Sequence, residues 1–292
     1  MLALAFALSS SLCWGVGDFI GGLQARRVPL LRVILVSQAV GLVVLVAVVA
    51  VRGVGPPDVV KMLPAVAGGV AGIAALSAFY RALAIGTMSV VAPISATGVA
   101  VPVVVGVASG DRPAALQLAG ILAASVGVVL ASRESGPGLA PKADSKASVA
   151  LALLAALGFG SFFVGLRISA RVDLVWALVS SRAAAVAALI AAGIVLSWVR
   201  ERPPASVGAV AAPGGSAVLP ALLVIGFLDL SANVLYALAT RHGLLSVVAV
   251  AASLYPLTTV LLARVVLGEH VRRIQEVGIA AALAGVVLIA VG

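Results

Sequence analysis

Three charged side chains lie well inside long apolar segments of this sequence, where an ionised group is unfavourable. They are Asp18, Arg182 and Asp229. A charge at the centre of a bilayer costs about 3 kcal/mol on insertion scales, and such residues usually pair with one another or line a substrate or ion pathway. These three residues are therefore the first candidates for binding or ion coupling.

Asp229 stands near the centre of its apolar segment and begins a polar helix face. Asn233 and Tyr236 follow it at positions i+4 and i+7, so all three side chains project to one side. This face could line a substrate cavity, with Asp229 as a coupling carboxylate, or form a hydrogen-bonded cluster that only holds helices together. The cost of a carboxylate in the middle of the membrane favours the cavity.

Arg182 lies in the apolar segment that precedes Asp229, and Asp229 is its natural partner. A permanent pair would neutralise both charges and would favour a structural role. A pair that opens on binding would allow Arg182 to hold a substrate carboxylate through two parallel hydrogen bonds. The sequence leaves both alternatives open.

Asp18 follows Trp14 by four residues, so both lie on one face of the first apolar segment. A carboxylate there could bind a cation or carry a proton. Its position near the end of the segment equally allows it to pair with a loop. Trp14 could be a cavity wall or an ordinary packing residue.

Further polar and aromatic side chains inside apolar segments extend the candidate site. The complete predicted substrate-binding set is Trp14, Asp18, Gln38, Ser77, Tyr80, Ser95, Ser161, Arg182, Asp229, Asn233, Tyr236 and Tyr255. Serine hydroxyls in helices often bond only to the preceding turn, so Ser95 and Ser161 are weaker members. No metal-ligand spacing, phosphate-binding glycine loop or nucleophile motif is recognisable, so we expect no catalytic site, metal site or cofactor and no enzyme activity.

The segments that carry these residues have the composition of transmembrane helices. The 292 residues are 63% hydrophobic and 10% charged, and the mean hydropathy is +1.25. Soluble domains have about 25% charged residues, whereas a membrane-spanning helix needs about 20 consecutive apolar ones. We predict an all-α integral membrane protein. The ten predicted spans are residues 2–22, 30–51, 62–84, 88–109, 114–132, 148–167, 174–198, 217–240, 245–267 and 273–291.

The chain divides into two similar halves of five predicted spans each. A polar linker at 133–147 separates the first repeat, 1–132, from the second, 148–292. Residues 117–130 align with 275–288 with an identical glutamine and two identical glycines, which we expect to allow close helix packing. An odd number of spans makes the repeat inverted, as in many secondary transporters that work by alternating access. The alternative is a duplicated membrane scaffold.

Several short motifs also resemble a known transporter family in order and spacing. They are Trp14-Gly15 early in the first span, Ala82-Leu83-Ala84 after Tyr80, Ser89-Val90-Val91-Ala92-Pro93, and Gly268-Glu269 after Pro256. Together with the two halves, they are similar to the EamA-type transporters of the drug/metabolite transporter superfamily over essentially the whole chain. The resemblance implies ten helices and export or exchange of small metabolites, often amino acids or related compounds.

The leading hypothesis is a secondary transporter of a small metabolite such as an amino acid, in the cell (inner or plasma) membrane. The rival is a proton-coupled multidrug or cation antiporter, which would need an unpaired acidic residue in its cavity. A membrane scaffold and a flippase for a lipid-linked intermediate are non-transporter alternatives. The expected partners are a small-molecule substrate, the lipid bilayer and, if transport is coupled, protons; monomer and homodimer remain open.

The net charge of +9 does not indicate nucleic-acid binding, because the cations stand singly or in pairs between apolar runs, as loop residues near lipid headgroups do. Loops on one side of the predicted topology hold ten Lys and Arg, and loops on the other side hold five. This bias would place the termini outside, whereas the resembled family implies both termini inside. The orientation stays open.

Overall fold

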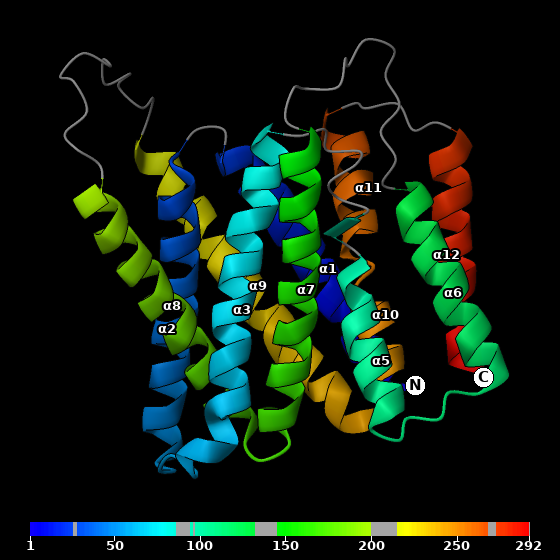
Figure 1. The fold of residues 1–292 in the computed structure, drawn as a ribbon, viewed down its shortest axis with the longest axis horizontal. Helices are drawn as coiled ribbons and strands as arrows, with labels where there is room; N and C mark the ends of the chain where they lie inside the picture. The colour runs from blue at the N-terminus through cyan, green and yellow to red at the C-terminus, as the bar shows by residue number, and fades with distance from the viewer. Residues whose placement is uncertain are drawn as a thin grey trace.

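The computed structural model describes residues 1–25, 28–85, 94–95, 97–131, 145–199, 215–267 and 273–291. Within these ranges all regular structure is helical, which confirms the predicted all-α class for the described part of the chain (Figure 1). The elements are α1 (Leu2–Ala25), α2 (Leu30–Arg52), α3 (Val59–Ile85), the 3-10 turn η1 (Thr97–Val99), α5 (Ala100–Ala108), α6 (Ala115–Ala131), α7 (Ser145–Ala170), α8 (Leu174–Val199), α9 (Gly215–His242), α10 (Leu245–Ala252), α11 (Tyr255–Leu267) and α12 (Arg273–Val291).

Six of the described helices are long and apolar enough to cross a membrane. The apolar stretches are Leu2–Gly21, Leu31–Arg52, Val59–Ala82, Lys146–Ala170, Leu174–Val195 and Val218–His242. They match the first three predicted spans of each half. Shorter apolar helices occupy Thr97–Ala108, Ala115–Gly127 and Glu276–Ile289, where further spans were predicted. The total of ten crossings therefore stays a prediction.

The outer surface of the bundle is apolar. Val43, Leu122 and Phe227 are 69%, 67% and 61% exposed, although each is a large hydrophobic residue within a helix. Such a surface would be unfavourable in water but matches the hydrocarbon tails of lipids. The exposed side chains thus agree with the spans in indicating a membrane-embedded bundle.

Two helix pairs form the centre of the bundle. Helix α3 packs along α7, and α1 packs along α9. If the two halves are related, these pairs are equivalent, because α1 and α7 come first and α3 and α9 third in their halves. Helices α2 and α8 contact both each other and the central pairs, while α6 and α12 pack together at one edge (Figure 1).

Glycines allow the paired helices to approach closely. A Cβ atom on Gly165 of α7 would lie 2.2 Å from the carbonyl oxygen of Pro64 in α3. A Cβ on Gly120 of α6 would lie 2.6 Å from the carbonyl oxygen of Gly285 in α12. These distances leave no room for a larger residue, so the predicted role of the repeated glycines in close packing is confirmed.

Pro64 lies inside α3, and a serine from α7 completes the hydrogen bonding there. Proline has no N–H and crowds the preceding turn. The Ser169 hydroxyl accepts a hydrogen bond from the Ala65 N–H at 3.0 Å and donates one to the Lys61 carbonyl at 2.9 Å. The backbone groups beside the proline are thereby satisfied within the membrane, as a helix in lipid requires.

The ninth predicted span, 245–267, matches the structure in its bounds but is interrupted within them. It consists of α10 and α11, which are separated at Ser253 and Leu254. Pro256 occupies the first turn of α11, where a missing N–H costs little. Irregular backbone within a membrane bundle is tolerated where it is buried in protein or lines a cavity.

Both termini lie at one end of the bundle, which we call the terminus side (Figure 1). The connections at 53–58, 109–114, 171–173 and 243–244 lie at the same end. Helix α2 ends there at Gly53, whose φ of 62° is left-handed and whose N–H donates to the Val49 carbonyl. Glycine adopts this conformation without a steric penalty, so it ends the helix cleanly.

Candidate functional site: a polar cavity at the centre of the bundle

A cavity of about 120 Å³ lies between the α1/α9 and α3/α7 pairs. Its walls come from the middle of these helices, from α2 and α8, and from the break between α10 and α11. A second cavity of about 50 Å³ shares Trp14, Asp18, Gln38 and Asp229 with the first. It extends along α1 as far as Gly21, away from the terminus side.

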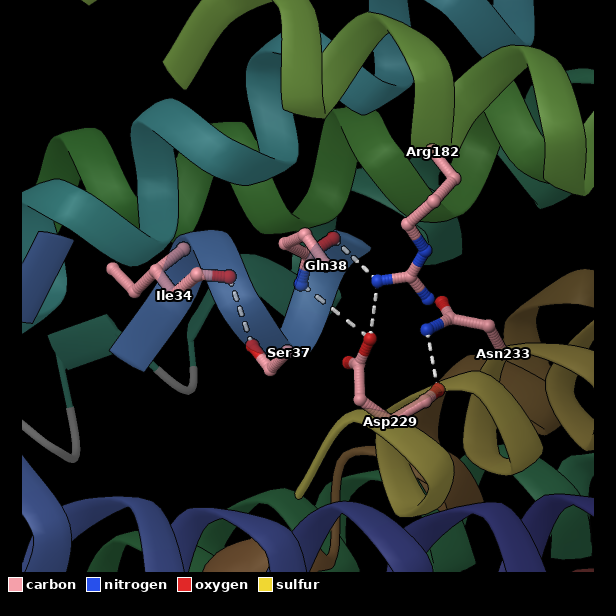
Figure 2. A network of polar contacts seen from close by, with 6 residues as sticks. All are labelled: Ile34, Ser37, Gln38, Arg182, Asp229 and Asn233. Carbon is pink, nitrogen blue, oxygen red and sulfur yellow. Dashed lines mark hydrogen bonds and ion pairs between the residues drawn. The ribbon is translucent and has the colours of Figure 1, made fainter. Parts of the chain in front are cut away.

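Three helices contribute to a polar cluster in the cavity wall, which we call the central cluster: Gln38, Arg182, Asp229 and Asn233 (Figure 2). One guanidinium nitrogen of Arg182, on α8, donates to both the Gln38 side-chain oxygen and the Asp229 carboxylate. The Gln38 amide, on α2, lies 3.5 Å from the same carboxylate oxygen. The Asn233 amide donates to the Asp229 carbonyl at 2.6 Å, one helical turn away on α9.

The members of the central cluster differ in exposure. Arg182 is only 6% exposed, whereas the Asp229 side chain is 26% exposed. Gly41 on α2 makes room for the arginine, since a Cβ there would lie 3.2 Å from Arg182 Nε. The Asn233 side-chain oxygen is buried and has no hydrogen-bond partner among the described residues. The cluster therefore presents a carboxylate and an unused acceptor near the cavity.

The structure pairs Arg182 with Asp229, as the sequence suggested. Both residues also line the cavity, and neither faces the outer surface. A pair of this kind carries no net charge, so its cost in the membrane is reduced. The geometry is compatible with a pair that a substrate opens.

Asp18 is placed differently from Asp229. It lines both cavities and is half-buried. Among the described residues it has no hydrogen bond and no ion pair, because the nearby arginine bonds to Asp229 instead. Asp18 is thus an acidic group that faces the cavity without a cationic side chain to neutralise it.

Aromatic rings form much of the remaining wall. Trp14 packs against Phe163 with ring centroids 5.4 Å apart and against Tyr255 at 6.4 Å, and all three line the larger cavity. Tyr236 does not line either cavity. It is fully buried behind the wall, stacks on Phe163 at 4.7 Å and donates to the Phe163 carbonyl at 3.3 Å.

The twelve predicted site residues separate into three groups. Those that line the larger cavity are Trp14, Asp18, Gln38, Ser95, Arg182, Asp229, Asn233 and Tyr255. Tyr80 lines only the smaller cavity, and Tyr236 supports the wall from behind. Ser77 and Ser161 are exposed away from both cavities and donate to carbonyls of their own helices, those of Ile73 and Leu157, each at 2.8 Å. The structure therefore leaves these two serines out of the site.

Several wall residues carry no signal in the sequence. Phe159, Phe162 and Phe163 on α7 line the cavity, as does Ser181 beside Arg182. Apolar side chains in a membrane helix can face lipid, protein or a cavity, and their type does not distinguish these surroundings. Only the four-residue spacing of Phe159 and Phe163 indicates that they share a face.

Comparison with known families agrees with this architecture. A model of the EamA-like transporter family matches the chain twice, over residues 1–133 and 146–291. The chain belongs to the EamA-like transporter family. Its membership confirms the resemblance in the sequence motifs and the expectation of a drug/metabolite transporter. Together with the six long apolar helices, it establishes a multi-pass membrane protein that acts on a small-molecule substrate within a lipid bilayer.

Solved structures extend the agreement to the fold. Twenty-five chains of solved structures match. One of them, described only as the crystal structure of a protein, gives a TM-score of 0.73 over 98% of this chain and 95% of its own length. At 17% sequence identity, this likeness supports the fold and does not bear on the substrate. No curated protein matches the sequence.

Proposed function

We propose that this family member is a secondary transporter that carries a small metabolite, such as an amino acid, across the cell membrane by alternating access. The observation that carries the proposal is the cavity at the centre of the bundle, which helices from both halves line and which the central cluster and Asp18 make partly polar. Such midplane cavities at repeat interfaces are where secondary transporters bind substrate. A membrane scaffold would need no such cavity at this place.

The arrangement of the central helices supports an inverted repeat of five spans per half. The α1/α9 and α3/α7 pairs exchange places when the halves are exchanged, and the cavity lies between them. A related pair of gates on opposite sides of one site is the arrangement that alternating access requires. In this proposal 1–132 and 148–292 are the two repeats and 133–147 connects them.

The cavity volume and wall chemistry agree with a small, partly polar substrate. One water needs roughly 10–15 Å³ of such a cavity, so about 120 Å³ holds on the order of ten non-hydrogen atoms. Arg182 would bind a substrate carboxylate through its guanidinium as the bond to Asp229 opens. The rings of Trp14, Phe163 and Tyr255 would pack against an apolar part of the substrate.

A second candidate, a proton-coupled antiporter of organic cations, rests on Asp18. Its carboxylate faces the cavity without an ion pair among the described residues, next to the ring of Trp14. A carboxylate beside aromatic faces is suited to a substituted ammonium group. In this case a proton and a cation would compete for Asp18.

The decisive experiment is flux in proteoliposomes over a panel of amino acids and organic amines, with and without a pH gradient. The transporter proposal predicts saturable flux of at least one solute, and Asp229→Asn should abolish this flux or uncouple it from pH. Wild-type, pH-driven flux in Asp229→Asn would remove Asp229 from the mechanism. Absence of flux for every solute would overturn the proposed function.

The same assay separates the two candidates. Flux of amino acids that survives Asp18→Asn favours the metabolite transporter. Flux of amines that disappears in Asp18→Asn and is driven by a proton gradient favours the antiporter. Ser161→Ala is a matched control, because Ser161 lies in α7 but outside the cavity. The flux of this variant should equal that of the wild type.

A further inference from the structure

A second cluster of charged and polar groups, away from the cavity, joins three helices at the terminus side. We call it the terminus-side cluster: Asp111, Arg167 and Ser246. One Asp111 carboxylate oxygen accepts hydrogen bonds from the Ser246 N–H at 3.0 Å and the Ser246 hydroxyl at 3.2 Å. The other oxygen lies 3.8 Å from an Arg167 nitrogen. The cluster thereby connects the α5–α6 loop, the end of α7 and the first turn of α10.

The terminus-side cluster follows the cavity along one face of α7, in the direction of the terminus side. Phe159, Phe163 and Arg167 follow each other at four-residue intervals, so their side chains share a helix face. The two phenylalanines line the cavity, and Arg167 stands one turn nearer the terminus side. Tyr236 lies between the phenylalanines and Arg167, where it is fully buried against Phe163. An aromatic layer and then the charged cluster thus lie between the cavity and the terminus side.

The hydrogen bonding of the cluster is incomplete around Arg167. A separation of 3.8 Å is too long for a hydrogen bond. The Arg167 Nε is buried and has no hydrogen-bond partner among the described residues. A buried arginine that is only partly satisfied is unfavourable, and such groups in native structures usually have a functional reason.

The Asp111 carboxylate is the part of the cluster that holds it closed. It caps the N-terminus of α10, where exposed N–H groups and the helix dipole attract an anion. The approach depends on Gly106, because a Cβ there would lie 2.6 Å from the Asp111 carboxylate oxygen and 3.1 Å from the Ser246 nitrogen. Helix α10 packs on α1, so the contact ties α7 to the opposite side of the cavity.

We propose that Asp111, Arg167 and Ser246 form the terminus-side gate of the central cavity, closed in this structure and opened when α7 and the α5–α6 loop separate from α10. The proposal rests on the proposed function, since a gate has a role only in a protein that opens its cavity to each side in turn. A transporter cycles only if its two states differ by a few kcal/mol, and the incomplete hydrogen bonding of Arg167 limits the stability of the closed state.

The test uses the single cysteine of the chain as a reporter and needs no substrate. Cys13 is the only cysteine in the sequence and lines the smaller cavity. Its rate of modification by a charged, membrane-impermeant thiosulfonate is measured separately from each side of sealed vesicles, and a C-terminal tag identifies the terminus side. We expect Asp111→Asn to raise the rate from the terminus side about tenfold, because it weakens a charge-assisted cap. The rate from the other side should stay the same or fall.

Two further variants make the test specific. Gly106→Ala leaves all charges in place but displaces the Asp111 carboxylate, and it should raise the terminus-side rate as Asp111→Asn does. Asp173→Asn is the matched control, since Asp173 also caps a helix at this end and pairs with an arginine, Arg52, but does not line the cavity. Its Cys13 rates should equal those of the wild type.

The proposal is overturned if the terminus-side rate stays at the wild-type value in both Asp111→Asn and Gly106→Ala. It is equally overturned if the rates from both sides rise together, because this would indicate general loosening of the bundle. A protein that carries no tested solute but shows the one-sided increase would keep these residues as the closure of the terminus side and overturn the proposed function. Failure of the gate and failure of the transport proposal are therefore distinguishable.

Discussion

The central cluster and the terminus-side cluster each join an arginine to an aspartate, but the two aspartates are satisfied in different ways. Asp229 takes its hydrogen bonds from side chains, those of Arg182 and Gln38, and is 26% exposed. Asp111 takes its short hydrogen bonds from Ser246, partly from the backbone, and is 7% exposed. Side chains can rearrange when a ligand enters, whereas a backbone N–H moves only with its helix. The first cluster is therefore suited to meeting a substrate and the second to holding helices together.

The largest expected effect follows from removing the arginine of the central cluster. Arg182→Met keeps the length of the side chain but leaves Asp229 without a cation, and we expect flux to disappear and stability to fall by about 3 kcal/mol. Thermal unfolding in detergent measures this loss, with the change in intrinsic tryptophan fluorescence as the signal. The double variant Arg182→Met with Asp229→Asn should recover stability but not flux, because it removes the unpaired charge. Flux in the double variant would show that the pair is only structural.

A smaller effect is expected for the arginine of the terminus-side cluster. In Arg167→Met the Asp111 carboxylate keeps both contacts to Ser246, and the unsatisfied Arg167 Nε is removed. We expect a loss of about 1 kcal/mol, clearly less than for Arg182→Met, in the same unfolding measurement. A loss as large as that of Arg182→Met would contradict the comparison, since it would mean that Asp111 depends on its arginine as Asp229 does.

The Ser246 hydroxyl should matter less again. Ser246→Ala removes one of the two donors to Asp111 but keeps the backbone N–H at 3.0 Å. A single hydrogen bond to a carboxylate with a remaining partner suggests a loss of about 0.5 kcal/mol. Ser125→Ala is the control, because its hydroxyl donates only to the Ile121 carbonyl of its own helix, and it should leave the melting temperature nearly unchanged. Equal shifts in the two variants would mean that the Asp111 contact contributes no stability beyond that of an ordinary serine.

The difference between the clusters also explains what the sequence could and could not predict. Arg182 and Asp229 stand near the middle of apolar segments, so their cost in lipid indicates that they pair. Arg167 lies three residues from the end of α7, where an arginine is ordinary, and its burial depends on Asp111, which is distant in sequence. Periodicity placed Asp229 and Asn233 on one face, but it does not fix how a helix is rotated toward its neighbours.

Because the sequence does not fix how each helix is rotated, it could not show which serines and aromatic residues line the cavity. Ser77 and Ser161 were as plausible from spacing as Ser95, yet only Ser95 lines the cavity. Tyr236 shares a face with Asp229 but lies about two turns further along α9, where Phe163 covers it. The class of protein and the central helices followed from composition, because apolar length determines a membrane span. The exact place of the break between α10 and α11, at Ser253 and Leu254, did not, since Pro256 is also compatible with a continuous helix.

The smallest effect is expected for a third aspartate–arginine pair, which lies outside the membrane-spanning segments and tests whether pairing alone determines stability. Asp173 accepts from Arg52 at 3.1 Å and caps α8 through the Trp176 N–H at 2.9 Å. Burial opposes ionisation of Asp173, but the hydrogen bonds from Arg52 and the backbone outweigh it and lower the pKa of the carboxyl. Because the pKa is lower in the folded protein, the contribution of the Asp173 carboxylate to stability is complete above the ordinary value of about 3.9 and is lost as the pH falls below it.

Asparagine caps a helix nearly as well as aspartate, so Asp173→Asn should lower the melting temperature least of the four variants at pH 7. The difference from the wild type should therefore shrink as the pH falls below the ordinary carboxyl pKa, measured with the same unfolding assay in acidic buffers. A shift at pH 7 as large as that of Arg167→Met would show that an exposed pair stabilises this bundle as much as a buried one, and the contrast between the two inner clusters would then lose its physical basis.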